Sequence, residues 1–287
     1  FDGVSLFIDL LSLEVSQGLQ AALSEAQNVQ RSVFWQQSYQ SGIPAILLSD
    51  GRVFDGGDSA PFAEGDRVQP ASRTAVQLVK DERQFLQTER NGLLVLRTGA
   101  LFSDAGDGYF NVLMRSLKDG KRIAINDQLK TCPTSMRDLS RVVVAMLEQL
   151  LCGAAVRGFY HYVSAVPVTP AEFAEQLLAH TSQHLNLPPV DIVAHRGGSD
   201  GELMVPALSC QRIWQDFAIK QLPWRADVPD MVRKWCLEAD GASPQGPYPV
   251  EYLDAGWYSN EHCGYGKDGV GDGTKAHGEH VVAPNRP

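Results

Sequence analysis

Residues 45–86 carry few side chains that could transfer a proton. Ser49 and Asp50 end an apolar run, and Thr74 and Lys80 lie on the helix predicted after a glycine-containing loop. The segment contains no tyrosine. A threonine hydroxyl has far too high a pKa to donate a proton near neutral pH. The segment therefore has the order strand, loop and helix, and its residue types predict poor acid catalysis.

Apolar runs and helical repeats alternate along the chain around this segment. Runs typical of buried parallel strands occur at residues 4–13, 45–48, 92–102, 121–125 and 158–165. Helical spacing predicts helices at residues 15–39, 71–90, 110–117, 136–151, 170–178, 211–217 and 228–237. Gly42 is a predicted helix C-cap, and Thr169 with Glu172 forms a predicted capping box. This alternation requires right-handed crossovers and predicts an α/β fold with a parallel sheet.

Two parts of the chain lack a regular pattern. Residues 184–206 are predicted to be an irregular connection, and residues 240–287 an irregular tail rich in Gly, Pro and charge. The tail contains His262, Cys263, His277 and His280, whose spacing fits no common zinc pattern. The five cysteines of the chain are widely spaced and form no C-x-x-C pair. We therefore predict neither a metal site nor a disulfide framework.

Charge and hydropathy narrow the possible partners. The net charge of −9 provides no broad positive field for a phosphate backbone, which argues against a nucleic-acid partner. No apolar run approaches the roughly 20 residues that span a bilayer, and residues 1–11 lack the basic start of a secretory signal. We expect a cytoplasmic protein without a membrane partner.

Five segments, in consistent order between residues 1 and 237, resemble motifs of one enzyme family. They are "RVFDGGDSAPFAEGDRVQP", "LRTGALF", "NDQLKTCPTSMRDLS", "GFYHYVSAVPVTPAEFAEQL" and "PALSCQRIWQDFAIKQLPWR". The sequence is similar here to dTDP-4-dehydrorhamnose reductases and related extended short-chain dehydrogenases. The resemblance implies a Rossmann-like lobe that holds NADPH and a smaller C-terminal lobe that holds a nucleotide sugar.

The resemblance also predicts how the chain is divided. Residues 1–105 are expected to be the remainder of the dinucleotide-binding lobe. Residues 106–239 are expected to complete the sheet and form the sugar-nucleotide lobe, and residues 240–287 are the tail. The glycine-rich turn that precedes the first strand in the family is absent from this chain, so we expect its first β-α units to be missing. An NADP(H) cofactor is predicted if that turn exists in the native protein, and no cofactor otherwise.

The catalytic positions of the family carry other residues in this chain. Counted from Pro70, the family tyrosine falls on Thr74 and the lysine on Leu78. A second register uses Lys80, but Val76 then takes the place of the tyrosine. The hydroxyl-bearing residue before the "VFDG" motif becomes Asp50, with Ser49 beside it. The resemblance therefore predicts that no catalytic set is intact.

Other positions of the motifs are candidate binding residues. The resemblance assigns Ser49, Asp50, Arg97 and Thr98 to the cofactor, although Arg97 could equally form a buried ion pair with Asp138 or Glu82. It assigns to the substrate the residues Phe54, Asp127, Gln128, Pro133 and Thr134. The loop after Gln128 has one residue more than the family pattern, so a structural turn is an equally good interpretation.

Two functional hypotheses follow from these observations. The first is a sugar-nucleotide-binding or regulatory relative without reductase chemistry, with a possible protein partner or homodimer; the regulatory β subunit of methionine adenosyltransferase is a precedent of this fold. The second is an active NADPH-dependent nucleotide-sugar reductase. It needs a displaced proton donor, for which Tyr109 and Tyr160 are the nearest tyrosines.

Overall fold

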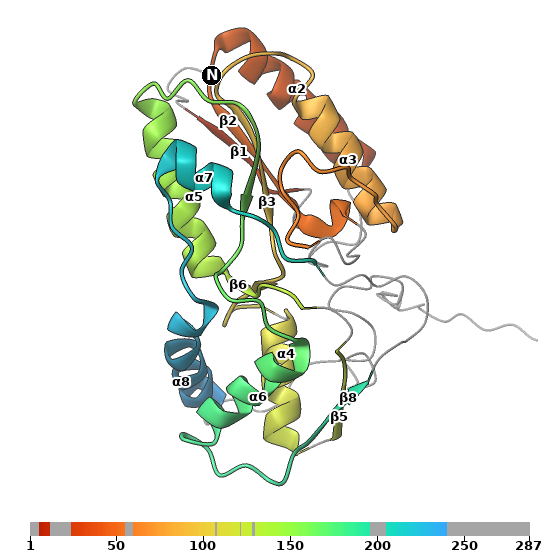
Figure 1. The fold of residues 1–287 in the computed structure, drawn as a ribbon, viewed down its shortest axis with the longest axis vertical. Coiled ribbons are helices and arrows are strands. Elements are labelled where there is room, and N and C mark those ends of the chain that lie inside the picture. Colours follow the sequence, from red (N-terminus) through yellow and green to blue (C-terminus); the bar gives the residue numbers. More distant parts are fainter. Residues whose placement is uncertain are drawn as a thin grey trace, which may run out of the picture.

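A four-stranded parallel sheet forms the centre of the larger lobe (Figure 1). The computed structural model describes residues 6–11, 24–54, 60–106, 108–120, 122–127, 130–195 and 205–239. The strands follow the order β1-β2-β3-β7. They are β1 (Phe7–Asp9), β2 (Ala45–Asp50), β3 (Leu93–Thr98) and β7 (Gly158–Tyr162). All three pairings are parallel, so the predicted α/β fold with a parallel sheet is confirmed.

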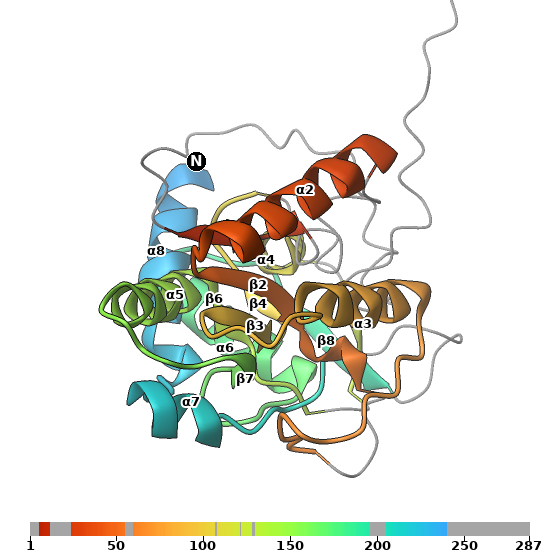
Figure 2. The same cartoon turned by 90° about the horizontal axis from the view of Figure 1, so that it is seen from above.

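Helices cover both faces of this sheet (Figure 2). One face carries α2 (Glu25–Ser41) and α3 (Arg73–Phe85), and the other carries α5 (Met136–Leu151) and α7 (Gln211–Phe217). The central strands β2 and β3 are therefore buried on both sides, which explains why they read as continuous apolar runs and not as alternating ones.

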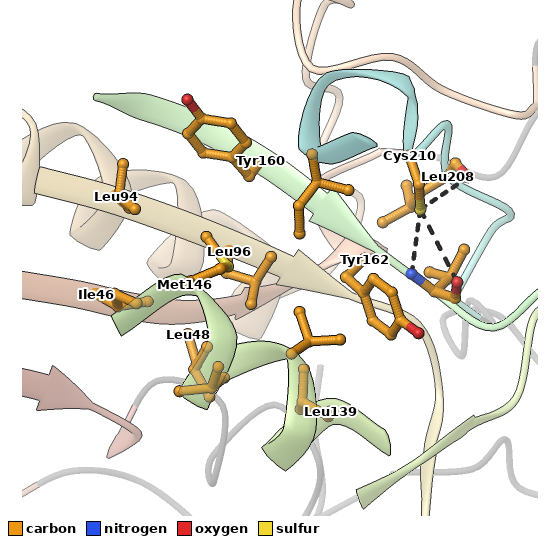
Figure 3. Close-up of a cluster of buried hydrophobic side chains, with 14 of the residues drawn as sticks. Ile46, Leu48, Leu94, Leu96, Leu139, Met146, Tyr160, Tyr162, Leu208 and Cys210 are labelled. Carbon is orange, nitrogen blue, oxygen red and sulfur yellow. Dashed lines mark hydrogen bonds between the residues drawn. The ribbon is translucent and has the colours of Figure 1, made fainter. Parts of the chain in front are cut away.

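The two faces of the sheet have separate cores. On the α5 and α7 face, Ile46, Leu48 and Leu94 pack with Met146 of α5 (Figure 3). On the other face, the apolar side chains of β2 and β3 pack against Trp35 of α2 and Phe85 of α3. Successive strand residues point to opposite faces, so each strand supplies both cores.

The smaller lobe is built around a two-stranded sheet and helices (Figure 1). Strand β5 (Arg122–Asn126) pairs in parallel with β8 (Asp191–His195). Their helical neighbours are α4 (Tyr109–Asp119), α6 (Pro170–Thr181) and α8 (Val228–Ala239), with the short η2 (Trp224–Ala226). The prediction that residues 184–206 lack regular structure was therefore wrong at β8, which is only partly buried and lacks a clear apolar alternation.

Short elements connect the two lobes. Strand β4 (Leu101–Phe102) follows β3 directly and pairs with β6 (Thr134–Ser135), which leads into α5. A short η1 (Gly51–Val53) follows β2. The predicted division into residues 1–105 and 106–239 stays a prediction, and the tail of residues 240–287, with its histidines, lies outside the described residues.

The local signals for helix ends are confirmed. The left-handed residue Gly42, with φ of 77°, caps α2, as glycine does at this position because it has no Cβ. Thr169 and Glu172 form the predicted capping box at α6. Within the described ranges, no helix is long and apolar enough to cross a membrane.

Candidate functional site

Three polar residues lie side by side across the carboxyl end of the sheet. Ser49 on β2 is opposite Arg97 on β3, and Arg97 is opposite His161 on β7. Parallel strands bring these residues to one edge, which is where α/β folds place their ligands. The row therefore occupies the expected place for chemistry.

The carboxylate of Glu82, on α3, binds two members of this row, Ser49 and Arg97. Ser49 donates a hydrogen bond to Glu82 Oε1 at 2.7 Å, and Arg97 holds both carboxylate oxygens, with Nε to Oε1 at 2.8 Å and Nη2 to Oε2 at 2.7 Å. All three side chains are buried, Arg97 with an exposed fraction of 2%. Of the two partners considered for Arg97, Glu82 is confirmed; Asp138 instead accepts from Arg141 and Tyr162.

Aromatic rings surround the Arg97 guanidinium. Its central carbon lies 4.3 Å from the ring centroid of Phe159 and 5.3 Å from that of Phe54. Phe54 stacks on Phe62 with 4.5 Å between ring centroids and meets the edge of His161. Phe54 is therefore enclosed by protein groups, and its predicted contact with substrate stays a prediction.

His161 is held as a neutral imidazole. Burial and the nearby Arg97 charge lower the pKa of His161 to about 3. The ring nitrogen Nδ1 lies 3.2 Å from the carbonyl oxygen of Phe62, so it carries the proton and donates it there. Nε2 then accepts from Arg97 Nη1 at 3.4 Å. His161 in this state does not serve as a general acid near neutral pH.

Asp50 and Thr98 complete the group that was predicted to contact a cofactor. Asp50 Oδ1 accepts from the backbone N–H of Arg52 at 2.8 Å and caps η1. The Thr98 hydroxyl donates to the carbonyl oxygen of Gly99 at 3.3 Å. These two residues, like Ser49 and Arg97, are buried and hydrogen-bonded within the protein. The four side chains fit a closed structural network better than a dinucleotide site, and their assignment to a cofactor stays a prediction.

The matched catalytic positions on α3 do not converge on this network. Leu78 is 2% exposed and belongs to the main core, with Val53 and Phe54. Thr74, one turn earlier, is partly exposed, and Lys80 is exposed. Residues two positions apart on a helix differ by about 200° around its axis, so Lys80 points away from the core that Leu78 enters. The described part of α3 offers no ammonium group to the strand ends.

Two of the predicted substrate residues, Asp127 and Thr134, form side-chain hydrogen bonds to backbone groups. Asp127 Oδ1 accepts from the backbone N–H of Ala171 at the start of α6, at 3.2 Å. The Thr134 hydroxyl donates to the carbonyl oxygen of Cys132 at 3.0 Å and accepts from the N–H of Ser164 at 3.1 Å. Pro133 is buried beside Thr134. Gln128 lies outside the described residues.

The two tyrosines considered as displaced proton donors lie away from the Ser49–Arg97–His161 row. The Tyr160 side chain projects from the opposite face of β7 into the α5 and α7 core, where its hydroxyl donates to Asp216 Oδ2 at 2.7 Å. Burial raises the pKa of Tyr160, and the hydrogen bond to Asp216 adds to this. Tyr109 begins α4 and stacks on Phe173 in the core of the smaller lobe. The Tyr160 hydroxyl thus lies on the face of β7 opposite the row, and the Tyr109 ring packs within the smaller lobe.

A pocket of about 620 Å³ lies elsewhere, between the loop after β7 and α7. Its walls include Ser164 and Val166 of that loop, Trp214 of α7, and Lys220 in the segment after α7. Its lining residues lie within four of the family-like segments, but these segments are far apart in the chain, so sequence reasoning did not bring them together as a pocket. Elsewhere in the described ranges, no cluster of three or more His, Cys, Asp or Glu side chains could hold a metal ion.

Comparisons with known proteins agree with this fold. The family model described as the RmlD substrate binding domain matches residues 21–236. A dTDP-4-dehydrorhamnose reductase of Sinorhizobium fredii is 27% identical over 210 residues, which cover 70% of this chain and 68% of that protein.

Two solved structures share the fold at lower identity. A dTDP-4-dehydrorhamnose reductase of Bacillus anthracis in complex with NADP is 18% identical, with a TM-score of 0.56 over 70% of this chain and 68% of that one. A short-chain dehydrogenase/reductase superfamily protein of Agrobacterium tumefaciens with bound NAD is 17% identical, with a TM-score of 0.61 over 83% of this chain and 81% of that one. With the Rossmann-like sheet in place and the family model matching most of its length, the chain belongs to the RmlD substrate binding domain family.

Proposed function

We propose that this chain is a nucleotide-sugar-binding relative of the dTDP-4-dehydrorhamnose reductases that does not catalyse hydride transfer. The observation that carries the proposal is Leu78. It stands where the resemblance places the catalytic lysine, and its side chain is packed in the core. Four residues earlier, Thr74 stands in the place of the tyrosine. The chain keeps the fold of the family while its matched positions lack the proton donor and the cation beside it.

The remaining groups at the strand ends do not replace this pair. Reduction of a carbonyl creates negative charge on its oxygen, which a catalyst must stabilise with donors or cations. Asp50 would bring a carboxylate to that place, which is the wrong sign of charge. The Ser49 hydroxyl already donates to Glu82. Arg97 donates to the same carboxylate through Nε and Nη2, and to His161 through Nη1.

An active reductase is the second candidate, because a curated relative at 27% identity carries that name. It requires a tyrosine displaced from α3 to reach the substrate. Tyr160 is bound to Asp216 on the other face of the sheet, and Tyr109 lies in the core of the smaller lobe. The arrangement therefore favours the binding protein. A cytoplasmic location, and a regulatory role exerted through a protein partner or a homodimer, belong to the same proposal.

The test uses the full-length protein in one set of samples. Its melting temperature is measured alone, with dTDP-4-dehydrorhamnose, with NADPH and with both, and the absorbance of reduced nicotinamide is then followed over time. Ligand that binds only the folded state raises the melting temperature by mass action. We expect the sugar nucleotide to raise it while NADPH is not consumed. Protein-dependent consumption of NADPH would support the reductase hypothesis instead. If neither ligand changes the melting temperature, the search turns to protein partners.

A further inference from the structure

We propose that the pocket between the loop after β7 and helix α7 is a second ligand site, which takes a small planar aromatic anion. The pocket has a volume of about 620 Å³, within the range of about 300–1,000 Å³ that is usual for small-molecule sites. This site is additional to any nucleotide-sugar site at the predicted substrate residues, because Phe54, Asp127, Pro133 and Thr134 do not line the pocket.

The position of α7 separates this pocket from α3. Helix α7 packs on the face of β7 that looks away from α2 and α3, with Phe217 against Tyr160 at 5.2 Å between ring centroids. Arg212 of α7 also donates to the carbonyl oxygen of Phe159 at 2.9 Å. The closed network around Arg97 lies on the opposite face. A ligand beside α7 therefore does not need the family's catalytic positions.

Hydrogen bonds hold one wall of the pocket in place. The backbone N–H of Ala165 donates to the carbonyl oxygen of Leu222 at 2.9 Å, and the side-chain amide of Gln221 donates to the carbonyl oxygen of Val163 at 2.8 Å. At the same end of β7, Cys210 hydrogen-bonds to the backbone of Val163 (Figure 3). The segment after α7 is thus tied to the end of β7. A preformed wall lowers the entropy lost when a ligand binds.

The loop after β7 shows two features that are unusual outside functional sites. Val166 has φ of 72°, a left-handed conformation that is strained for a β-branched residue. Ser164 is 1% exposed, and its hydroxyl has no hydrogen-bond partner in the part of the chain that the structure describes. Buried hydroxyls without a partner are rare in folded proteins. Strain and an unpaired hydroxyl occur together in the loop that lines the pocket.

The rim of the pocket defines the chemistry of its ligand. The Trp214 side chain is 46% exposed, an unusual exposure for a flat apolar ring. The Lys220 ammonium lies 5.1 Å from the centroid of that ring. None of the described residues that line the pocket is acidic. A ligand with an aromatic ring can stack on the indole while its anionic group pairs with Lys220.

Calorimetric titration of the full chain tests this proposal with three probes. Naphthalene-2-carboxylate has the ring and the charge, naphthalene-2-carboxamide has the ring alone, and acetate has the charge alone. We expect saturable binding of the carboxylate, binding about fivefold weaker for the carboxamide, and none for acetate; a fivefold change is typical of one exposed ion pair. Lys220→Gln should remove the difference between the first two probes, and Trp214→Ala should weaken both about tenfold.

The matched control is Lys234→Gln, because Lys234 is another exposed lysine, in α8, where it pairs with Asp104 at 2.9 Å. It should leave all affinities unchanged. Trp214 and Lys220 are exposed, so their variants should keep the melting temperature of the parent. Absence of saturable carboxylate binding, or equal affinity in the parent and both pocket variants, would overturn the proposal. Competition between the carboxylate and dTDP-4-dehydrorhamnose would overturn the claim of a second site.

Discussion

The two faces of the sheet, one covered by α3 and the other by α7, differ in how far their polar and aromatic side chains are exposed to solvent. The α3 side is closed: Ser49, Arg97 and His161 are buried, and Glu82 takes up their hydrogen bonds. The α7 side is open, with Trp214 and Lys220 at the rim of a pocket. The polar residues at the carboxyl end of the sheet are thus bonded to one another and buried.

Glu82→Gln has the largest expected effect on stability. It leaves the buried Arg97 guanidinium without its charge partner, so we expect the free energy of unfolding to fall by about 3–5 kcal/mol. Denaturant titration measures it. Glu89→Gln is the matched control, because the Glu89 side chain is almost fully exposed. A loss below about 1 kcal/mol for Glu82→Gln would mean that the network is open to water.

Leu78→Ala tests whether the matched lysine position is part of the core. Removing this buried side chain should cost about 2–5 kcal/mol, near the lower end if the neighbours relax into the space. Val76→Ala on the same helix is the control, because Val76 is 39% exposed and should cost much less. Equal effects in thermal unfolding would contradict the packing of Leu78 described above.

His161 should make stability depend on pH. Its folded pKa of about 3 is below the unfolded value of about 6.5, so the unfolded chain binds the proton more readily. The contribution is fully present above pH 6.5 or so and is lost as pH falls toward 3, at up to about 1.4 kcal/mol per pH unit. His161→Gln should flatten this part of the pH profile of unfolding. The exposed His184→Gln is the control, and an identical slope in both variants would contradict the buried neutral imidazole.

The smallest expected losses of unfolding free energy are those of two tyrosine variants on the α7 side of the sheet. Tyr162 donates to the buried Asp138, whereas Tyr160 donates to Asp216, whose side chain is partly exposed. Tyr162→Phe should cost about 1.5–3 kcal/mol, because a buried charged acceptor loses its donor. Tyr160→Phe should cost about 1 kcal/mol, since water can replace its hydroxyl at Asp216. The reverse order in denaturant titrations would contradict this account of the two carboxylates.

Much of the fold could be predicted because its signals are local. The apolar run at β2, the glycine after α2 and the capping box at Thr169 each act within a few residues. Strand β8 escaped prediction because it is partly exposed and is defined mainly by its pairing with β5, about 70 positions earlier. Pairing over such a separation leaves no local trace in a strand whose faces are not clearly apolar or polar.

The candidate site could be predicted only in part. Arg97 and Glu82 were recognisable as a possible pair, but the register that aligns Ser49, Arg97 and His161 needed the sheet. The assignment of Arg97 to a cofactor followed from residue type, and burial by Glu82 and Phe159 is not visible in sequence. The pocket beside α7 could not be predicted, because its walls lie within separate family-like segments that meet only after folding.

The most direct test of the central claim is the rate of NADPH oxidation with dTDP-4-dehydrorhamnose, in samples where a rise in melting temperature shows that the sugar nucleotide is bound. We predict binding with no oxidation above the protein-free background, because α3 carries Thr74 and Leu78 at the matched positions. Protein-dependent oxidation that disappears when Tyr109 or Tyr160 is replaced by Phe would contradict the account and identify a displaced proton donor.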